Sequence, residues 1–235
     1  MTAIDFEKAL DSLSWDFLFK SLESFGFSAS FIAWIKTFPK NITSCVVNNG
    51  YFTSPFNVTQ GVRQGDPLSP CLFILVLELL AVSIRNNDRI RGIMVDGNEI
   101  KLVTFAYDMT SFVRDKPSYR TFLNVIKLFG TYSGLKINHD KTEVLLLGNM
   151  EASSSELEVT EIKRSLKILG VHFTYNRSLF HKLNFESTEK SIRKLLRGWG
   201  WRGLTLIGKV QITKSFALPK ILYKLTLMSN RKKFI

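Results

Sequence analysis

Short apolar segments separated by turn signals are the feature that most restricts the fold of this 235-residue chain. Asn49-Gly50, Asp96-Gly97 and Tyr107-Asp108 each lie between two strand-like stretches, which is typical of tight β-hairpins and therefore of antiparallel sheets. Helical spacing occurs between them, from about Pro70 to Arg85 and from about Ser118 to Tyr132. Because strands and helices alternate without a regular βαβ order, we predict an α+β fold.

The remaining segments suggest how the chain is divided. A very short strand followed by a helix that Ser14 caps is predicted near the N-terminus, and "LKILGVHF" reads as a strand. "MEASSSELEVT" is small and polar, as linkers are. Beyond it, the sequence predicts a basic amphipathic helix after Lys190 and a helical segment that breaks before Pro219. We therefore expect a core over 1–150, a linker and strand over 151–174, and a mainly helical segment over 175–235.

Charge is distributed unevenly along the chain. Residues 1–150 carry 15 Lys and Arg against 14 Asp and Glu, whereas residues 151–235 carry 17 against 6. From Lys190 to the end there are 12 basic residues and no acidic one. A basic tail can serve solubility alone, but a one-sided block of this length favours a polyanion such as nucleic acid.

Composition argues against several other classes of protein. Two cysteines and three scattered histidines exclude a Cys/His zinc module and give no sign of a disulfide scaffold. The N-terminus lacks the pattern of a secretory signal, so we expect an intracellular protein of the cytoplasm or nucleus. The twelve-residue run "CLFILVLELLAV" contains Glu78 and is shorter than the roughly 20 residues of a membrane span, so it predicts a buried helix and no membrane partner.

Three features could carry chemistry, and each is weak when taken alone. Asp5 follows a strand, with Asp11 six residues later, but an aspartate at a strand end is more often a helix cap than a metal ligand. The loop "QGVRQGDPLSP" has glycines that allow close approach of a ligand. Asp108 lies at a hairpin tip, where an acidic residue is ordinarily turn chemistry.

Taken in order, the motifs are much more specific. "IDFEKALDSLSWDFL", "GVRQGDPLSPCLF", "FAYDMTSF", "SGLKINHDKTE" and "LKILGVHF" follow one another in the chain. In this order and spacing the chain resembles the reverse transcriptases of LINE-type (non-LTR) retrotransposons. The likeness extends over essentially the whole sequence, since the basic C-terminal part resembles the segment that follows the polymerase palm. It implies a right-hand polymerase palm, an antiparallel sheet backed by helices, followed by a basic helical thumb, with the fingers missing or truncated.

The resemblance also implies RNA-directed DNA synthesis by two-metal nucleotidyl transfer. Two Mg²⁺ ions about 4 Å apart would clamp the primer hydroxyl and the leaving phosphate, held by carboxylates from separate strands. Asp5 matches the first of these carboxylates. Tyr107 and Asp108 match the two aspartates of an F-A-D-D hairpin. Lys141 matches a lysine that neutralises or protonates the pyrophosphate leaving group, so Asp5, Asp108 and Lys141 are the expected catalytic residues.

Binding residues are implied in the same way. The expected partners are an RNA template, a DNA primer or duplex, and a deoxynucleoside triphosphate. Nucleotide and template contacts fall on Leu10, Arg63, Gln64 and Gly65. Primer and duplex contacts fall on Leu169 and Gly170, in the turn that grips the primer end, and on Lys190, Arg193, Lys194 and Arg197, which would track duplex phosphates.

The chain departs from the pattern at its most important position. Tyr107 stands where the indispensable aspartate of F-A-D-D belongs, and a phenol is neutral at pH 7. Loss of a metal-binding carboxylate is expected to lower the rate about 10³-fold or more. Leu10 replaces the usual phenylalanine, and neither an endonuclease nor complete fingers are recognisable, so a longer polyprotein is expected in an intact element. Two interpretations therefore stand: an impaired polymerase, or an inactive nucleic-acid-binding or decayed copy.

Overall fold

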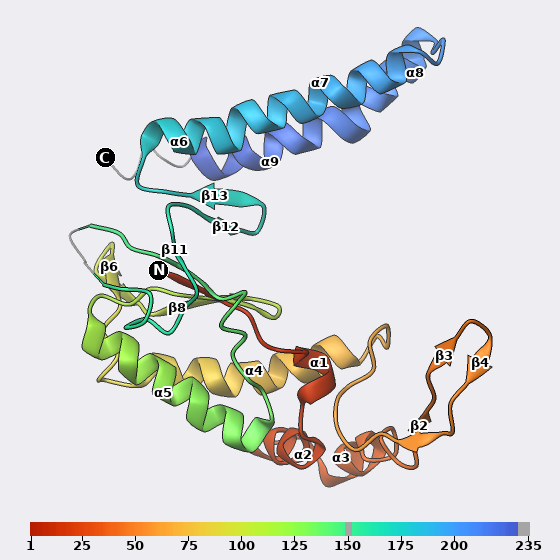
Figure 1. Cartoon of the computed structure of the whole chain (residues 1–235), viewed down its shortest axis with the longest axis vertical. Helices are drawn as coiled ribbons and strands as arrows, with labels where there is room; N and C mark the ends of the chain where they lie inside the picture. Colours follow the sequence, from red (N-terminus) through yellow and green to blue (C-terminus); the bar gives the residue numbers. More distant parts are fainter. Residues whose placement is uncertain (149–151, 230–235) are drawn as a thin grey trace. The chain divides into compact units, whose positions relative to one another are not determined.

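The computed structural model describes residues 1–148 and 152–229 (Figure 1). The chain divides into two compact units, Met1–Ile162 and Lys163–Ile235. The boundary between them follows the polar stretch 150–160 and falls within residues 151–174, which the sequence predicts as a linker and a strand. Within the described residues, no helix combines the length and the apolar character needed to cross a membrane.

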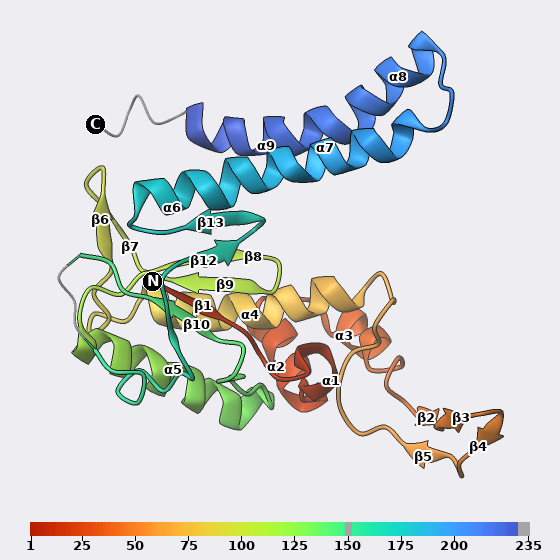
Figure 2. The ribbon, with the colours of Figure 1, turned by 45° about the horizontal axis from the view of Figure 1, so that its top comes forward.

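A five-stranded sheet lies at the centre of the first unit. Its strands, in the spatial order β11-β10-β1-β9-β8, are Ile162–Lys163, Glu143–Leu145, Thr2–Ile4, Asp108–Ser111 and Leu102–Phe105. The short β1 is the middle strand and pairs antiparallel with both β10 and β9, while β8 and β9 form a hairpin (Figures 1 and 2). The mixed α+β prediction is confirmed.

Helices provide most of the core of this unit. They are α1 Ala9–Ser12, α2 Trp15–Ser24, α3 Ala29–Ile35, α4 Ser69–Arg85 and α5 Lys116–Ser133. The long α4 lies against α2, α5 and β8, and its apolar run buries Phe73 and Leu80 completely. Phe122 of α5 is buried in the same cluster. The apolar run of α4 is therefore an internal helix. Ser14 caps α2 as predicted, since its hydroxyl accepts the Phe17 N–H.

A narrow ribbon projects from the rest of the first unit between α3 and α4 (Figure 2). It consists of two strand pairs, β2 Thr43–Ser44 with β5 Phe56–Asn57, and β3 Val47–Asn48 with β4 Tyr51–Phe52. Its tip is Asn49-Gly50, where both residues have positive φ (50° and 84°), as a two-residue type I′ turn requires. A second hairpin, β6 Ile93–Val95 and β7 Asn98–Ile100, turns at Asp96-Gly97. Both predicted turns are confirmed.

The third predicted turn is displaced by one residue. Phe105 pairs with Asp108, so the two turn residues are Ala106 and Tyr107 and not Tyr107 and Asp108. Ala106 has φ 53°, a left-handed conformation that L-residues other than glycine adopt only at a cost of about 1–2 kcal/mol. The register explains the displacement. It places Met109 in the core, and a slip by one residue would turn every side chain of β9 to the opposite face.

The polar segment predicted as a linker is packed where the structure describes it. Leu157 is 2% exposed, and its carbonyl accepts a hydrogen bond of 2.9 Å from Tyr119 Oη of α5. Lys116 and Lys127, also from α5, form ion pairs with Glu156 and Glu158. Residues 149–151 lie outside the described residues. The prediction relied on small polar residues and missed the anchors that follow them.

The second unit is a hairpin and a series of helices. Strands β12 Leu166–Ile168 and β13 Val171–Phe173 form the hairpin, where the sequence predicted a single strand. The helices are α6 Arg177–His181, η1 Lys182–Glu186, α7 Ser187–Gly200, α8 Leu206–Ile212, η2 Thr213–Ala217 and α9 Leu218–Ser229, and η1 and η2 are π-helical. Helices α7 and α9 run side by side (Figures 1 and 2).

The predicted break before Pro219 is wrong, because the helix continues through it. The Leu218 N–H donates to the Thr213 carbonyl five residues earlier, so the chain enters the proline with π-helical hydrogen bonding. A proline removes one helical donor and crowds the preceding turn. The wider π turn accommodates that ring where an α-helical turn would kink.

Candidate active site

The register of the central strands brings two predicted carboxylates to the same edge. Ile4, the last residue of β1, is opposite Met109 of β9. Asp5 follows Ile4 and Asp108 precedes Met109, so both carboxylate residues lie next to this pair at the same end of the two strands. Asp5 is half-buried and Asp108 is exposed. Strand pairing therefore brings together the motifs of Asp5 and Asp108, which are far apart in the sequence.

The backbone of Asp5 is fixed by the turn that carries Lys141. The Asp5 N–H donates to Thr142 Oγ1 at 3.3 Å, and the Asp5 carbonyl accepts the Asn138 N–H at 2.9 Å. Asn138 Oδ1 in turn accepts the N–H groups of Asp140 and Lys141, both at 3.2 Å. The turn that presents the exposed Lys141 side chain is thus joined directly to Asp5.

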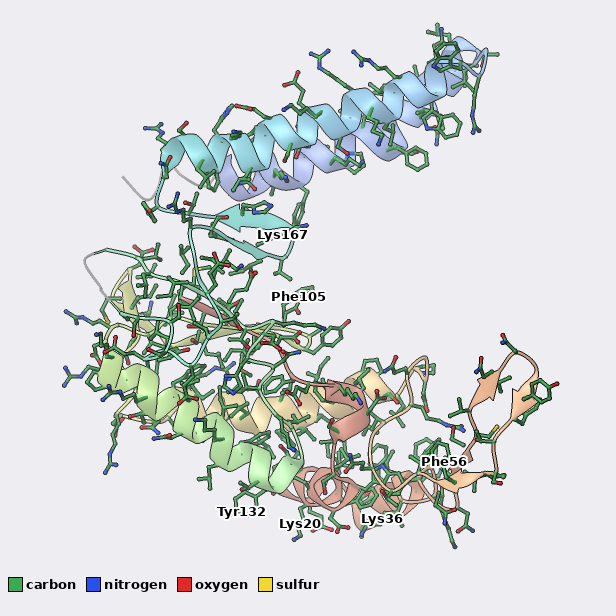
Figure 3. The ribbon with its side chains drawn as sticks, viewed as in Figure 1. Lys20, Lys36, Phe56, Phe105, Tyr132 and Lys167 are labelled. Carbon is green, nitrogen blue, oxygen red and sulfur yellow. The ribbon has the colours of Figure 1, made fainter. Side chains whose placement is uncertain are left out.

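Tyr107 lies at the corner of the β8–β9 hairpin. Tyr107 is 55% exposed and Phe105 is 63% exposed. Figure 3 labels Phe105 on this hairpin. The corner therefore presents two aromatic residues at the end of the sheet where Asp5 and Asp108 lie. Neither ring supplies a metal ligand at neutral pH.

The side chains of Asp5 and Asp108 limit how divalent cations could bind at this end of the sheet. Within residues 1–148 and 152–229, no three His, Cys, Asp or Glu side chains are grouped so as to hold a metal ion. Asp5 and Asp108 provide carboxylate oxygens, the donors that Mg²⁺ prefers. Two protein carboxylates suffice for one such ion, which completes its shell with water and phosphate oxygens. At position 107, where the resemblance implies a further carboxylate for a second ion, the chain has a tyrosine.

The glycine-containing loop 61–65 lies directly on the segment that follows Asp5. Gly61 N–H donates to Leu13 O and Val62 N–H to Leu10 O, both at 2.7 Å, while Trp15 Nε1 donates to Gly61 O at 2.6 Å. Gly61 has φ 90°, and a Cβ there would lie 2.6 Å from the Asp11 carbonyl oxygen. Only glycine permits this close approach.

The predicted nucleotide-binding residues lie where loop 61–65 contacts residues 10–15. Leu10 is half-buried and accepts the Val62 hydrogen bond through its carbonyl. Arg63 and Gln64 are exposed, and Gly65 has φ 88° with open space around it. Gln64 Nε2 donates to both carboxylate oxygens of Asp11, at 3.2 Å each. Leu10 and the loop are therefore parts of one surface.

The predicted primer-contacting turn belongs to the second unit. Leu169 and Gly170 connect β12 to β13 with φ values of 47° and 82°, a two-residue turn with both residues left-handed. Tyr223 Oη of α9 donates a hydrogen bond to the Leu169 carbonyl. Asn184 of η1, 1% exposed, accepts the His172 N–H and donates to the His172 carbonyl, each at 2.9 Å. Helices on both sides thus fix this turn.

Lys224 also helps to hold the helices next to the β12–β13 hairpin in place. Lys224 Nζ donates to the Asn184 carbonyl at 2.9 Å and to Thr188 Oγ1 at 2.7 Å, which links α9 to η1 and α7. Burial lowers the pKa of Lys224 below its ordinary value, and the nearby charge of Lys167 lowers it further.

The basic helix α7 is amphipathic, as the sequence predicts. Ile192 is buried, Leu195 and Trp199 are half-buried, and Leu196 is 39% exposed. All four predicted phosphate-contacting side chains on this helix are exposed: Lys190, Arg193, Lys194 and Arg197. Arg193 also pairs with Glu189 at 2.7 Å. The basic side chains are therefore accessible on the surface of the unit.

Several structural partners of these residues were missed by sequence reasoning. Thr142, Asn138 and Tyr223 form hydrogen bonds with predicted residues, and Asn184 forms them with His172, two residues after the predicted turn. Asp11 was considered only as a second carboxylate near Asp5. A single sequence holds no pattern that pairs such polar residues across long separations.

Comparison with known proteins gives the family. The sequence profile of the family "Reverse transcriptase (RNA-dependent DNA polymerase)" matches residues 1–173. The "Transposon TX1 uncharacterized 149 kDa protein" of Xenopus laevis is 25% identical over 99% of this chain, and the "Retrovirus-related Pol polyprotein from type-2 retrotransposable element R2DM" of Drosophila melanogaster is 28% identical over 73% of it.

A similar polyprotein of a type-1 retrotransposable element R2, from Popillia japonica, is 26% identical over 96% of the chain. The chain spans only 18% of the Xenopus protein, 17% of the Drosophila protein and 38% of the Popillia protein. The relatives are thus polyproteins of retrotransposable elements, and the match covers both the sheet with its loop and the β12–β13 hairpin. The chain belongs to the reverse transcriptase (RNA-dependent DNA polymerase) family.

Proposed function

We propose that this chain is the polymerase domain of a LINE-type retrotransposon protein in which nucleotidyl transfer is strongly impaired while nucleic-acid binding persists. The observation that supports this is the register of β1 and β9, which brings Asp5 and Asp108 to the same end of the two strands, next to Tyr107. The framework for two carboxylates is retained, and the third carboxylate position carries a phenol.

In this proposal, the two units correspond to a palm and a thumb. The palm consists of the five-stranded sheet with α4 and α5, and the exposed basic side chains of α7 contact duplex phosphates. Leu169 and Gly170 hold the primer end, and the loop at Gln64 contacts the incoming nucleotide and the template. The substrates are an RNA template, a DNA primer and a deoxynucleoside triphosphate, and the domain works within a longer polyprotein.

The chemistry needs charge neutralisation as the primer hydroxyl attacks the α-phosphate. When bound, Mg²⁺ would supply Lewis-acid stabilisation of the attacking and leaving oxygens. Asp5 and Asp108 would hold the cation at the end of β1 and β9. Lys141, whose backbone is linked to Asp5 through Asn138, would neutralise the pyrophosphate. Tyr107 contributes no charge, which lowers transition-state stabilisation by several kcal/mol, or about 10³-fold in rate.

Primer extension on an RNA template tests the proposal directly. Wild-type chain, Tyr107→Asp and the double variant Tyr107→Asp/Asp5→Asn are compared at equal concentration with Mg²⁺. We expect Tyr107→Asp to extend the primer about 10³-fold faster than wild type, and the double variant to lose that gain. Equal rates for the wild type and Tyr107→Asp would refute the impairment.

The alternative is a protein that only binds nucleic acid, and the basic surface of α7 is the observation that favours it. The same preparations are assayed for binding to an RNA–DNA hybrid over a range of salt concentrations. Binding whose logarithm falls linearly with the logarithm of salt, without synthesis even in Tyr107→Asp, would support this alternative. Synthesis restored by Tyr107→Asp would exclude it.

A further inference from the structure

An ionic hydrogen bond joins two motifs that lie 53 positions apart in the sequence. Gln64 Nε2 of the loop donates to Asp11 Oδ1 and Oδ2, each at 3.2 Å. Asp11 belongs to α1, six residues after Asp5. Both side chains are exposed, so the contact lies on the surface that the loop presents to ligands. Neither the strand pairing nor the core requires it.

The backbone around the pair is held more tightly than an exposed contact alone would achieve. Three hydrogen bonds of 2.6–2.7 Å fix Gly61 and Val62 to Leu10, Leu13 and Trp15. The absence of a side chain at Gly61 lets the loop approach the Asp11 carbonyl closely. With both main chains fixed, the Gln64 side chain needs little further ordering to reach Asp11. This lowers the entropy cost that weakens most surface contacts.

The chemistry of the pair fixes the orientation of the Gln64 amide. The oxygen and nitrogen of a glutamine amide are interchangeable in shape, and their assignment rests on the hydrogen-bond partners. An ionised carboxylate can only accept hydrogen bonds, so the NH₂ group must face Asp11. The oxygen Oε1 is consequently the polar atom that Gln64 can offer to a ligand. Without Asp11, either end of the amide could be presented.

We propose that Asp11 is a positioning residue that orients Gln64 so that Oε1 accepts a hydrogen bond from the incoming nucleotide. Asp11 acts through Gln64, because both of its carboxylate oxygens accept a hydrogen bond from the Gln64 amide. The ligand group selected is a hydroxyl or N–H donor of a nucleoside triphosphate. The inference rests on the proposed function, in which the loop contacts the nucleotide.

A double-mutant cycle on nucleotide binding tests this inference without requiring turnover. The affinity of a template-complementary deoxynucleoside triphosphate is measured on the chain bound to an RNA–DNA primer-template, for wild type, Asp11→Ala, Gln64→Ala and the double variant. Asp11→Ala should weaken binding about 3- to 10-fold, the cost of ordering a freed side chain. The same change should have no effect when Gln64 is already alanine.

Two controls separate positioning from general effects. Asp88→Ala removes the same charge from an exposed loop after α4 and should leave nucleotide affinity unchanged. Asp11→Asn keeps one carbonyl oxygen as an acceptor for the Gln64 NH₂ and should recover most of the affinity lost in Asp11→Ala. If Asp11→Ala weakens binding equally with and without Gln64, Asp11 acts on the nucleotide directly and the inference is overturned.

The side-chain amide signals of Gln64 in a ¹⁵N-correlated NMR spectrum give a second, ligand-free readout. They are assigned by their loss in Gln64→Ala, and Asp11→Ala should shift them while Asp88→Ala should not. Unshifted signals would overturn the inference. So would normal nucleotide affinity in Gln64→Ala. If the chain binds no primer-template at all, the proposed function fails, and the NMR comparison still decides whether Asp11 orients Gln64.

Discussion

The side chain of Asn184 is expected to carry much of the stability of the β12–β13 hairpin. In a hairpin with a two-residue turn, the pair next to the turn, Ile168 and Val171, exchanges hydrogen bonds. At the next pair, Lys167 and His172, the backbone groups point away from the partner strand. Asn184 contacts the His172 N–H and carbonyl there, as a third strand would. Replacement of Asn184 by alanine should therefore loosen the hairpin.

The magnitude follows from the contacts that alanine would remove. Asn184 makes two hydrogen bonds of 2.9 Å with His172 and one of 3.0 Å with the Phe180 carbonyl, all from a side chain that is 1% exposed. A net contribution of about 0.5–1.5 kcal/mol for each gives a loss of about 1.5–4.5 kcal/mol. A loss of about 1.5 kcal/mol, the lower end of this range, raises the opening equilibrium of the hairpin more than about 10-fold.

Amide hydrogen exchange measures this opening locally, which matters in a chain of two units that need not unfold in one step. Exchange over residues 166–173 should accelerate at least about 10-fold in Asn184→Ala, while exchange in α4 stays unchanged. Asn184→Asp keeps the acceptor oxygen but places a carboxylate next to two carbonyl oxygens. At pH 7 the hairpin of this variant should therefore exchange as fast as that of Asn184→Ala. Exchange should slow when acid protonates the carboxylate. Acceleration below 3-fold in Asn184→Ala would refute the argument.

Two further predictions concern backbone strain and a partly buried charge. Gly61→Ala should destabilise the first unit by at least 1 kcal/mol more than Gly65→Ala in denaturant titrations, because both have φ near 90° but only at Gly61 would a Cβ meet the Asp11 backbone, at 2.6 Å. In the folded chain the pKa of Lys224 is lowered, mainly by burial and further by the charge of Lys167. Between this folded-state pKa and the ordinary value, the unfolded chain binds a proton that the folded chain has released. The stability of wild type relative to Lys224→Met should therefore rise as pH increases through the folded-state pKa of Lys224 toward its ordinary 10.5, and a difference that is flat with pH up to 11 would contradict this.

Local sequence signals predicted the elements whose geometry they dictate. Asn49-Gly50 and Asp96-Gly97 turn where they were expected, because these residue types adopt positive φ at little cost. The helix α4 was recognisable from its apolar run, which only Glu78 interrupts between residues 71 and 82. The turn at Ala106-Tyr107 was displaced, because the pairing of β9 with β1 and the burial of Met109 outweigh the preference of aspartate for turns. Tertiary contacts decide where local preferences are weak.

The candidate site shows the same division between local and long-range information. Motifs identified Asp5 and Asp108, but their placement at the same end of the sheet depends on a strand pairing that joins residues more than 100 positions apart. The hydrogen bond from Asp5 to Thr142 and that from Gln64 to Asp11 are likewise long-range and lack a periodic signature.

Tyr107 lies outside the contacts that set the pairing of β1 and β9. Tyr107 occupies an exposed turn position and contributes nothing to the register, which is set by Ile4, Met109 and their neighbours. A change at position 107 can therefore remove a carboxylate while the strands that would present it keep their pairing. For the same reason, an aspartate placed at that position should meet Asp5 and Asp108 on an intact framework.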